Sequence, residues 1–267
     1  MPDLSPSPHR TTALVTGASM GIGLELARQI AMHGHNLILV ARHRETLETV
    51  SEMLEAQHSV SATVMVADLS DPNAPAALFD EVRNSAIHID FLINNAGFGL
   101  GGEFSDTDGN RELDMIQVNI AALTHLTKLF LPGMLERRAG GIMQVASTAA
   151  FQPGPLMAVY YATKAYVLSF SQALSEELRG TGVTVTALCP GPTATNFADT
   201  ARMSNSRLFV HAGLASASDV ARYGYAAMMR GKRIAIPSVR DRVMVQVVRL
   251  APRAMVTRIV KAIQQNR

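Results

Sequence analysis

Short, uninterrupted apolar runs alternate along most of this 267-residue chain with longer stretches of helical periodicity. Continuous apolar runs are typical of parallel strands that are covered on both faces, whereas half-exposed strands alternate polar and apolar residues. Repeated strand–helix units join parallel strands through right-handed crossovers. The pattern therefore predicts an α/β fold with one doubly wound parallel sheet of about seven strands and helices on both faces.

The expected strands cover residues 12–16, 36–41, 62–67, 90–94, 141–146, 183–189 and 233–237. The expected helices cover residues 21–32, 45–56, 72–86, 111–131, 157–179 and 218–230. We expect a disordered arm at 1–10, one α/β domain at 11–237 and a helical tail at 238–267. Ligands of such sheets bind outside the carboxyl ends of the strands, so site residues are sought there.

Composition narrows the class of protein. Hydrophobic residues make up 48% of the chain, which excludes a disordered protein. The single cysteine, Cys189, cannot close an internal disulfide, which favours a reducing compartment and a cytoplasmic location. No run of 18 apolar residues and no signal-peptide pattern occurs, so we expect no membrane-spanning helix.

A glycine-rich turn follows the first strand, with the sequence TGASMGIG from Thr16 to Gly23. Glycines allow a tight turn and close approach of the backbone to a ligand, and the N-terminus of the following helix suits a pyrophosphate. The turn indicates a Rossmann-type nucleotide site, although its G-x-x-x-G-x-G spacing differs from the general fingerprint. The same residues satisfy G-x-S-x-G, so a serine hydrolase that uses Ser19 is an alternative. No strand precedes this turn to supply an oxyanion loop, and His211 is the only late histidine.

Further motifs stand at the other predicted strand ends. They are NNAG at 94–97, Asn119 in the long helix, Ser147 after the fifth strand, YYATK at 160–164 and PGPTAT at 190–195. Together with the glycine turn, this set resembles the short-chain dehydrogenase/reductase family, in its shorter branch of about 250 residues. The resemblance runs from about Thr11 to Pro237. It implies an oxidoreductase that transfers a hydride between a nicotinamide cofactor and a carbonyl or secondary alcohol.

Tyr160 and Lys164 lie four residues apart and share one face of a helix. A phenol is a poor acid at neutral pH, and a nearby ammonium should lower the pKa of Tyr160. The neighbouring Tyr161 has the uncharged Ala165 at the same spacing. The resemblance agrees and implies that Tyr160 transfers the proton while Lys164 also binds the nicotinamide ribose.

The resemblance assigns two further catalytic residues. Ser147 stands 13 residues before Tyr160 and would hydrogen-bond the substrate oxygen. Asn119 would hold a water that links to Lys164 in a proton relay. A structural amide that links helices is the alternative role for Asn119, because a buried amide needs hydrogen-bond partners.

The second strand ends at Ala41, where an acid would favour NAD, and Arg42 follows at once. A guanidinium pairs well with phosphate, so we expect NADP(H) to be preferred over NAD(H). Met20 weakens this expectation, because many NADP-using relatives carry a second basic residue there. The residues expected to bind the cofactor are Gly17, Ser19, Gly21, Ile22, Gly23, Arg42, Asp68, Leu69, Asn95, Gly97, Lys164, Pro190, Gly191, Thr193 and Thr195.

The substrate is expected to be a small carbonyl or alcohol compound held by residues 98–102, 151–157 and 196–217. A non-catalytic, NADP(H)-sensing relative is the alternative from another class, and the intact set of Asn119, Ser147, Tyr160 and Lys164 argues against it. The eight histidines are scattered, so no metal site is expected. The resemblance also implies a homodimer or homotetramer.

The tail carries an uneven share of the charge. Residues 230–267 contain ten Lys and Arg and one acid, a net charge of +9, whereas the rest of the chain carries −7. Val239, Val243, Met244, Val247 and Val248 share one helical face, and Met255, Ile259, Val260 and Ile263 repeat the pattern after Ala251-Pro252. We expect this face to pack on the domain or on a second subunit, with contact to a membrane surface as the alternative. Nucleic acid is not an expected partner, because no aromatic residues lie among the basic ones.

Overall fold

The computed structural model describes residues 10–201, 203, 206 and 213–265. Most of the expected arm at 1–10, His211 and parts of the 196–217 segment lie outside these residues. The main sheet has seven parallel strands in the order β3-β2-β1-β4-β5-β6-β9. These strands are β1 Thr12–Thr16, β2 Asn36–Ala41, β3 Ala62–Val66, β4 Phe91–Asn94, β5 Gly140–Val145, β6 Val183–Leu188 and β9 Ile234–Ala235.

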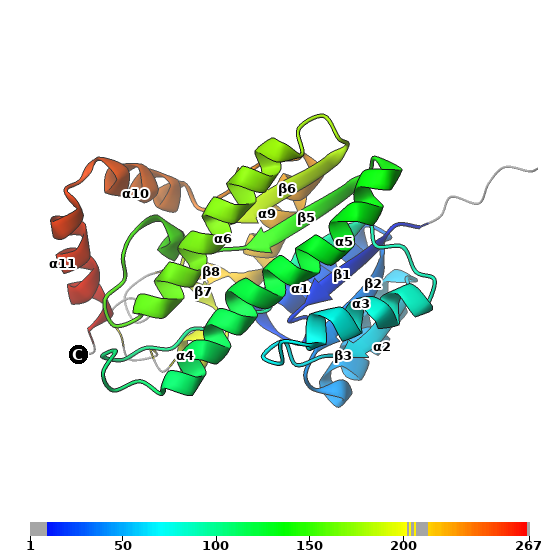
Figure 1. Ribbon diagram of the computed structural model, residues 1–267, viewed down its shortest axis with the longest axis horizontal. Helices are drawn as coiled ribbons and strands as arrows, with labels where there is room; N and C mark the ends of the chain where they lie inside the picture. The colour runs from blue at the N-terminus through cyan, green and yellow to red at the C-terminus, as the bar shows by residue number, and fades with distance from the viewer. Residues whose placement is uncertain (1–9, 202, 204–205, 207–212, 266–267) are drawn as a thin grey trace, which may run out of the picture.

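Helices cover both faces of this sheet, so the predicted doubly wound Rossmann-type fold is confirmed (Figure 1). One core cluster joins the sheet to α1 Gly21–Met32, α2 Arg44–His58 and α9 Ala217–Met229. A second cluster joins the other face to α3 Ala74–Asn84, α5 Leu123–Arg137 and α6 Ala158–Glu177. The remaining short elements are α4 Gly109–Ile116, the π-helical η1 Gln117–Ala122, the 3-10 helix η2 Thr148–Phe151, α7 Phe197–Thr200, and a two-stranded sheet of β7 Thr193–Ala194 with β8 Ala215–Ser216.

The long helix differs from its expected bounds. It runs from Gly109 to Arg137 through α4, η1 and α5, and it continues past Pro132, near which the prediction ended it. Pro132 lies on the exposed side, where the carbonyl that loses its helical donor can bond water. Within the described residues, this run alone is long and apolar enough to cross a membrane. Leu126 and Met134 of α5 are fully buried in the second core cluster, as in a core helix of a doubly wound sheet.

The tail forms two helices, α10 Val239–Leu250 and α11 Arg253–Gln264, which lie at the end of the molecule opposite α2 and α3 (Figure 1). The break between them falls at Ala251 and Pro252, as predicted from the sequence. Helix α9 begins at Ala217, one residue before the expected start at 218, with Ser216 in the N-cap position. In its first turn Asp219 pairs with Arg222 at 2.6 Å.

Candidate active site

The glycine turn between β1 and α1 offers bare backbone to a ligand. Gly17 and Gly21 have φ of +65° and +58°, a left-handed conformation that favours glycine. A Cβ on Gly23 would lie 2.1 Å from the Gly17 carbonyl oxygen, so only glycine lets the first turn of α1 pack there. No side chain caps α1 and no acid occupies its first turn. Its N–H groups and dipole therefore fit the pyrophosphate of a dinucleotide.

The turn is held in place from the end of β4. The Asn95 side chain donates to the Thr16 and Gly17 carbonyl oxygens at 2.9 and 3.2 Å. The buried Thr16 hydroxyl accepts from the backbone N–H groups of Asn95 and Ala96, both at 3.0 Å. Asn95, expected to bind the cofactor, thus also fixes the glycine turn. Thr16 was not among the expected site residues. Its position as a hydroxyl residue at the end of an apolar strand could have identified it.

The adenosine end of the expected site lies at the ends of β2 and β3. The exposed Arg42 follows β2, and Asp68 follows β3. Burial raises the pKa of Asp68, but this effect is outweighed by hydrogen bonds from Ser70 and by the nearby Arg42 and His43. The pKa of Asp68 is therefore lower than usual, and the carboxyl group stays ionised. The Leu69 side chain packs in the core, which leaves only its main chain for a ligand.

The loop after β6 faces the glycine turn. A Cβ on Gly21 would lie 3.3 Å from the Thr195 methyl carbon, so the two segments are opposite walls of one site. The Pro190 carbonyl oxygen accepts from the Thr148 N–H at 2.9 Å, which fixes this loop to the end of β5. Within the loop, the Thr193 hydroxyl donates to the Gly191 carbonyl oxygen at 2.9 Å. Of the remaining expected residues, Ser19 is half-buried in the glycine turn and Ile22 packs against the core.

The four expected catalytic residues come together near these two segments. Ser147 lies two residues past the end of β5, directly before η2, and hydrogen-bonds the Tyr160 side chain from α6. The Lys164 Nζ lies 5.8 Å from the centre of the Tyr160 ring and donates to the Val145 carbonyl oxygen at 2.8 Å. Asn119 and Lys164 both border Gly97, where a Cβ would lie 2.8 Å from the Asn119 Oδ1 and 3.5 Å from the Lys164 Nζ. The bare backbone at Gly97 therefore also fits a bound cofactor.

Burial sets the protonation states of this group. It raises the pKa of Tyr160, and the hydrogen bond from Ser147 only partly opposes the rise. The expectation that Lys164 gives Tyr160 a lowered pKa is therefore wrong. Burial also lowers the pKa of Lys164 to about 8, with the nearby Cys189 opposing, and raises that of the Cys189 thiol to about 12. Tyr160 is thus a neutral phenol that can donate a proton.

Asn119 makes the hydrogen bonds of a structural amide, which was the alternative to its expected role in a proton relay. Its Nδ2 donates to the Phe98 carbonyl oxygen and to the Thr163 hydroxyl, both at 3.0 Å. Its Oδ1 accepts from the Phe98 N–H at 3.1 Å. The amide therefore fixes the loop after β4 to α6. It projects from the π-helical segment η1, which the sequence analysis did not predict.

An apolar cluster surrounds Tyr160 on the substrate side. It combines Leu100, Met157 and Met203 with the Phe197 ring, whose centre is 5.2 Å from that of Tyr160. These residues come from the three segments that were expected to bind the substrate. The described part of the cluster indicates a site for a partly apolar molecule.

Helix α11 of the tail also belongs to this cluster. Val256 and Val260 pack in it, and the buried Gln264 donates from Nε2 to the Tyr161 hydroxyl. Burial raises the pKa of Tyr161 to about 12, so its hydroxyl is neutral. The Oε1 of Gln264 has no partner among the described residues. The tail therefore helps to build the wall behind Tyr160 and Tyr161.

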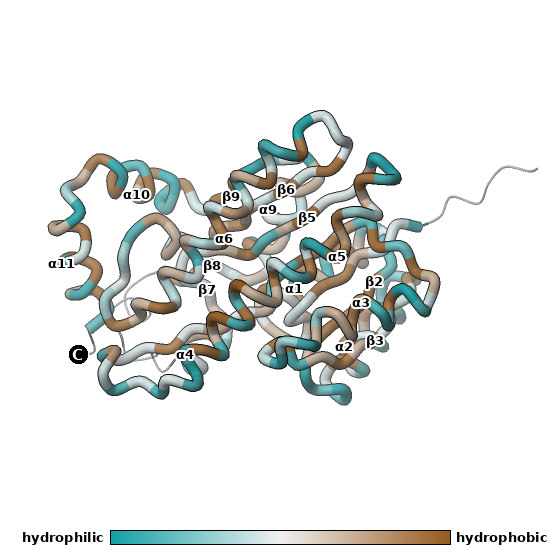
Figure 2. Tube along the Cα trace, viewed as in Figure 1, coloured by the Kyte–Doolittle hydropathy of each residue, from teal (hydrophilic) through white to brown (hydrophobic). Residues whose placement is uncertain are grey.

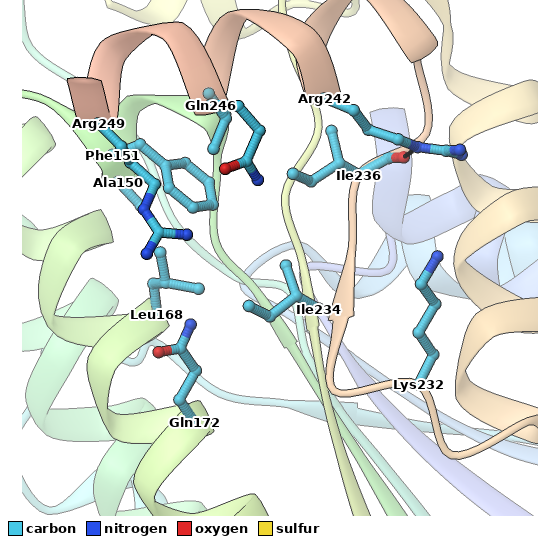
Figure 3. Close-up of a pocket in the computed structure, with 11 residues that line it drawn as sticks. Ala150, Phe151, Leu168, Gln172, Lys232, Ile234, Ile236, Arg242, Gln246 and Arg249 are labelled. Carbon is cyan, nitrogen blue, oxygen red and sulfur yellow. Dashed lines mark hydrogen bonds between the residues drawn. The ribbon is translucent and has the colours of Figure 1, made fainter. Parts of the chain in front are cut away.

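A separate hollow of about 560 Å³ lies between α6, β9 and α10 (Figure 3). Its floor is apolar, with Leu168, Ile234 and Ile236, and three cations line it. None of the four expected catalytic residues reaches it. In the described ranges, no group of three His, Cys, Asp or Glu side chains is placed to hold a metal ion.

Comparison with known proteins agrees with this arrangement. The family model for short chain dehydrogenases matches residues 11–206. The chain is 36% identical over 200 residues to hydroxysteroid dehydrogenase-like protein 1 of Gallus gallus, covering 74% of this chain and 60% of that protein. It is 37% identical over 197 residues to oxidoreductase UcpA of Escherichia coli, covering 73% and 74%.

Among solved structures, a short-chain dehydrogenase from Sphingobium yanoikuyae in complex with NADPH aligns with a TM-score of 0.82 and 30% identity. That alignment covers 92% of this chain and 95% of the other. The fold, the site and these matches define the chain as an oxidoreductase of the Rossmann type. It belongs to the short-chain dehydrogenase/reductase family. The family match ends at residue 206, so α10 and α11 lie beyond it.

Proposed function

We propose that the protein is an NADP(H)-dependent oxidoreductase acting on a carbonyl or secondary alcohol, with Tyr160 as the group that transfers the proton. The observation that carries the proposal is the cluster of Ser147, Tyr160 and Lys164 at the end of β5, beside the glycine turn. When bound, the nicotinamide would supply or accept the hydride. The chain's own residues position the substrate oxygen and move the proton.

In the direction of reduction, the neutral Tyr160 hydroxyl donates its proton to the substrate oxygen, and Ser147 holds that oxygen by a second hydrogen bond. The charge that develops on Tyr160 is stabilised by Lys164, which is cationic below its pKa of about 8. Oxidation reverses these steps. The apolar cluster around Tyr160 excludes water and favours a substrate with an apolar portion.

Two observations support NADP(H) over NAD(H). The exposed Arg42 makes no ion pair within the described part of the chain, so it is available to a 2′-phosphate. The S. yanoikuyae dehydrogenase was solved with NADPH. The cofactor would lie along Gly17, Gly21, Gly23 and Gly97, where the backbone is bare.

The test pairs two tyrosines on one helix. Tyr160→Phe removes the proton donor and keeps the ring, so NADPH oxidation in a screen of carbonyl compounds should be abolished, while NADPH binding persists. Tyr161→Phe is the matched control and should keep most of the activity, because Gln264 engages that hydroxyl away from the reaction. Reversed effects would refute the assignment. If the wild-type protein bound NADPH but did not oxidise it in the presence of any carbonyl compound of the screen, it would instead be a non-catalytic sensor.

A further inference from the structure

The outer face of the tail is an exposed apolar stripe. Val239, Val243 and Val247 of α10 are 69%, 58% and 58% exposed, and Leu250 is 89% exposed. At 3.6 residues per turn, these four side chains fall within an arc of about 80°. The same arrangement continues on α11 with Met255, Ile259 and Ile263. Seven of the sixteen exposed large apolar side chains in the described ranges thus lie on α10 and α11. Figure 2 shows hydrophobic and hydrophilic residues alternating along the trace of these two helices.

Both helices pack on the domain through their inner faces, so the stripe faces away from the domain. Val245 of α10 and Val256 and Val260 of α11 are buried against the body. The expected packing face of the tail is therefore only partly right. Val248 and Val260 pack on the domain, whereas its exposed members face away from it: Val239, Val243, Val247, Met255, Ile259 and Ile263. The tail packs on the domain through its inner residues, so it needs no cover on its outer face in order to stay folded.

Cations border the stripe. On α10, Arg240 lies on one side of it and Arg242 and Arg249 lie on the other, while Arg258 borders it on α11. The single acid, Asp241, is turned inward, where its carboxylate would contact a Cβ on Gly191 at 2.4 Å. Lys232 and Arg242 line the hollow beside α10 (Figure 3). Both donate to the Tyr223 hydroxyl, at 2.8 and 3.0 Å. The outer face of the tail therefore presents positive charge with no exposed acid.

These charges favour one occupant over another. In a twofold-symmetric dimer through the stripe, the same patch would meet itself, so the cations of one copy would face those of the other. Like charges at an interface oppose association. A surface of anionic phospholipids offers the opposite charge and an apolar layer for the valine, leucine, methionine and isoleucine side chains.

We propose that the outer face of α10 and α11, defined as the stripe and the cations beside it, docks on an anionic membrane surface. The two helices lie flat at the interface, with the stripe among the acyl chains and the cations at the headgroups. Because the inner face of α11 packs around Tyr161, docking places the substrate side of the protein next to the membrane. The binding does not depend on the proposed enzymatic activity.

The test is flotation of the full chain with phosphatidylcholine vesicles, with and without an equal part of phosphatidylserine. The intact protein should float with the anionic vesicles at low salt, several-fold less at high salt, and not with pure phosphatidylcholine. Val243→Glu with Val247→Glu should lower the bound fraction at least tenfold. The matched control, Met32→Glu with Leu113→Glu, adds the same acids at exposed apolar positions elsewhere and should bind as wild type.

Thermal melting and NADPH binding of both double variants check that they are folded. Equal flotation of the Val243→Glu, Val247→Glu variant and the wild type would overturn the proposal, as would no flotation of the intact protein. A third result would also overturn it. If sedimentation showed a smaller oligomer for that variant alone, the stripe would be a subunit contact.

Discussion

Replacing Thr16 with valine removes one buried hydroxyl and keeps the branched shape of the side chain. Thr16 ends β1 and is almost fully buried. Its oxygen accepts from the N–H groups of Asn95 and Ala96, and it donates to the Ile93 carbonyl oxygen at 3.3 Å. The hydroxyl therefore joins the end of β4 to the end of β1, directly below the glycine turn.

The cost follows from which groups lose their partners. Asn95 N–H keeps a second acceptor, the Ile93 carbonyl oxygen at 3.1 Å, whereas Ala96 N–H has no other acceptor in the described ranges. An orphaned buried N–H costs about 1–3 kcal/mol, and each other lost bond about 0.5–1.5 kcal/mol. With one orphaned N–H and two other lost bonds, Thr16→Val should lower the free energy of unfolding by about 2–6 kcal/mol. For a chain of this size, at about 2 °C per kcal/mol, that is a drop in Tm of roughly 4–12 °C.

Calorimetry and an NADPH titration measure the two consequences, because a loosened turn should also weaken cofactor binding. Thr16→Ser is the control, since it keeps the hydroxyl and loses one methyl group, worth about 1 kcal/mol. The valine variant should be the less stable of the two. If Thr16→Val melted at the wild-type temperature while Thr16→Ser did not, packing and not hydrogen bonding would hold these strand ends together.

Arg42→Asp should raise the Kd of NADPH at least tenfold in a fluorescence titration and change that of NADH far less, since a charged hydrogen bond is worth about 1.5–3 kcal/mol. An equal loss of affinity for NADPH and NADH would show that Arg42 does not bind the 2′-phosphate. Lys164 loses its charge as the pH rises through its pKa of about 8, so kcat/KM should fall above that pH. Lys164→Arg should move the fall to higher pH, and an unmoved alkaline limb would assign it to another group. Gln264→Leu leaves the Tyr161 hydroxyl buried without its partner and should cost about 1–3 kcal/mol in thermal unfolding. Adding Tyr161→Phe should recover part of this loss, and strictly additive losses would refute the coupling.

The main sheet was predictable because its signal is local. Runs such as 12–16 and 36–41 have an uninterrupted apolar centre, at 13–15 and 37–41, and the observed strands have the predicted limits. Elements without a local signal were missed or misplaced. The two-residue strands β7 and β8 are too short for a pattern, and β9 spans two residues where five were expected. The π-helical segment η1 has the same apolar spacing as the α-helix around it.

The candidate site was predictable where residue type and strand end coincide. Ser147, Tyr160 and Lys164 could be found because each stands at a fixed place relative to a strand or helix. The contact of Gln264 with Tyr161 joins residues 103 positions apart, and no spacing rule reaches that far. The raised pKa of Tyr160 also escaped prediction, because burial depends on the whole fold and outweighs the effect expected from Lys164.

Because α11 contributes to the wall behind Tyr161, the ribosome completes the cofactor side of the site earlier than the substrate side. The glycine turn, Asn95, Ser147 and Lys164 have all been synthesised before residue 200 is added. Val256, Val260 and Gln264 follow much later. A nascent or truncated chain that stops near residue 250 therefore holds every group expected to bind the cofactor, but it lacks one side of the enclosure around the substrate. Such a chain is expected to capture a nicotinamide nucleotide before it can select what to reduce.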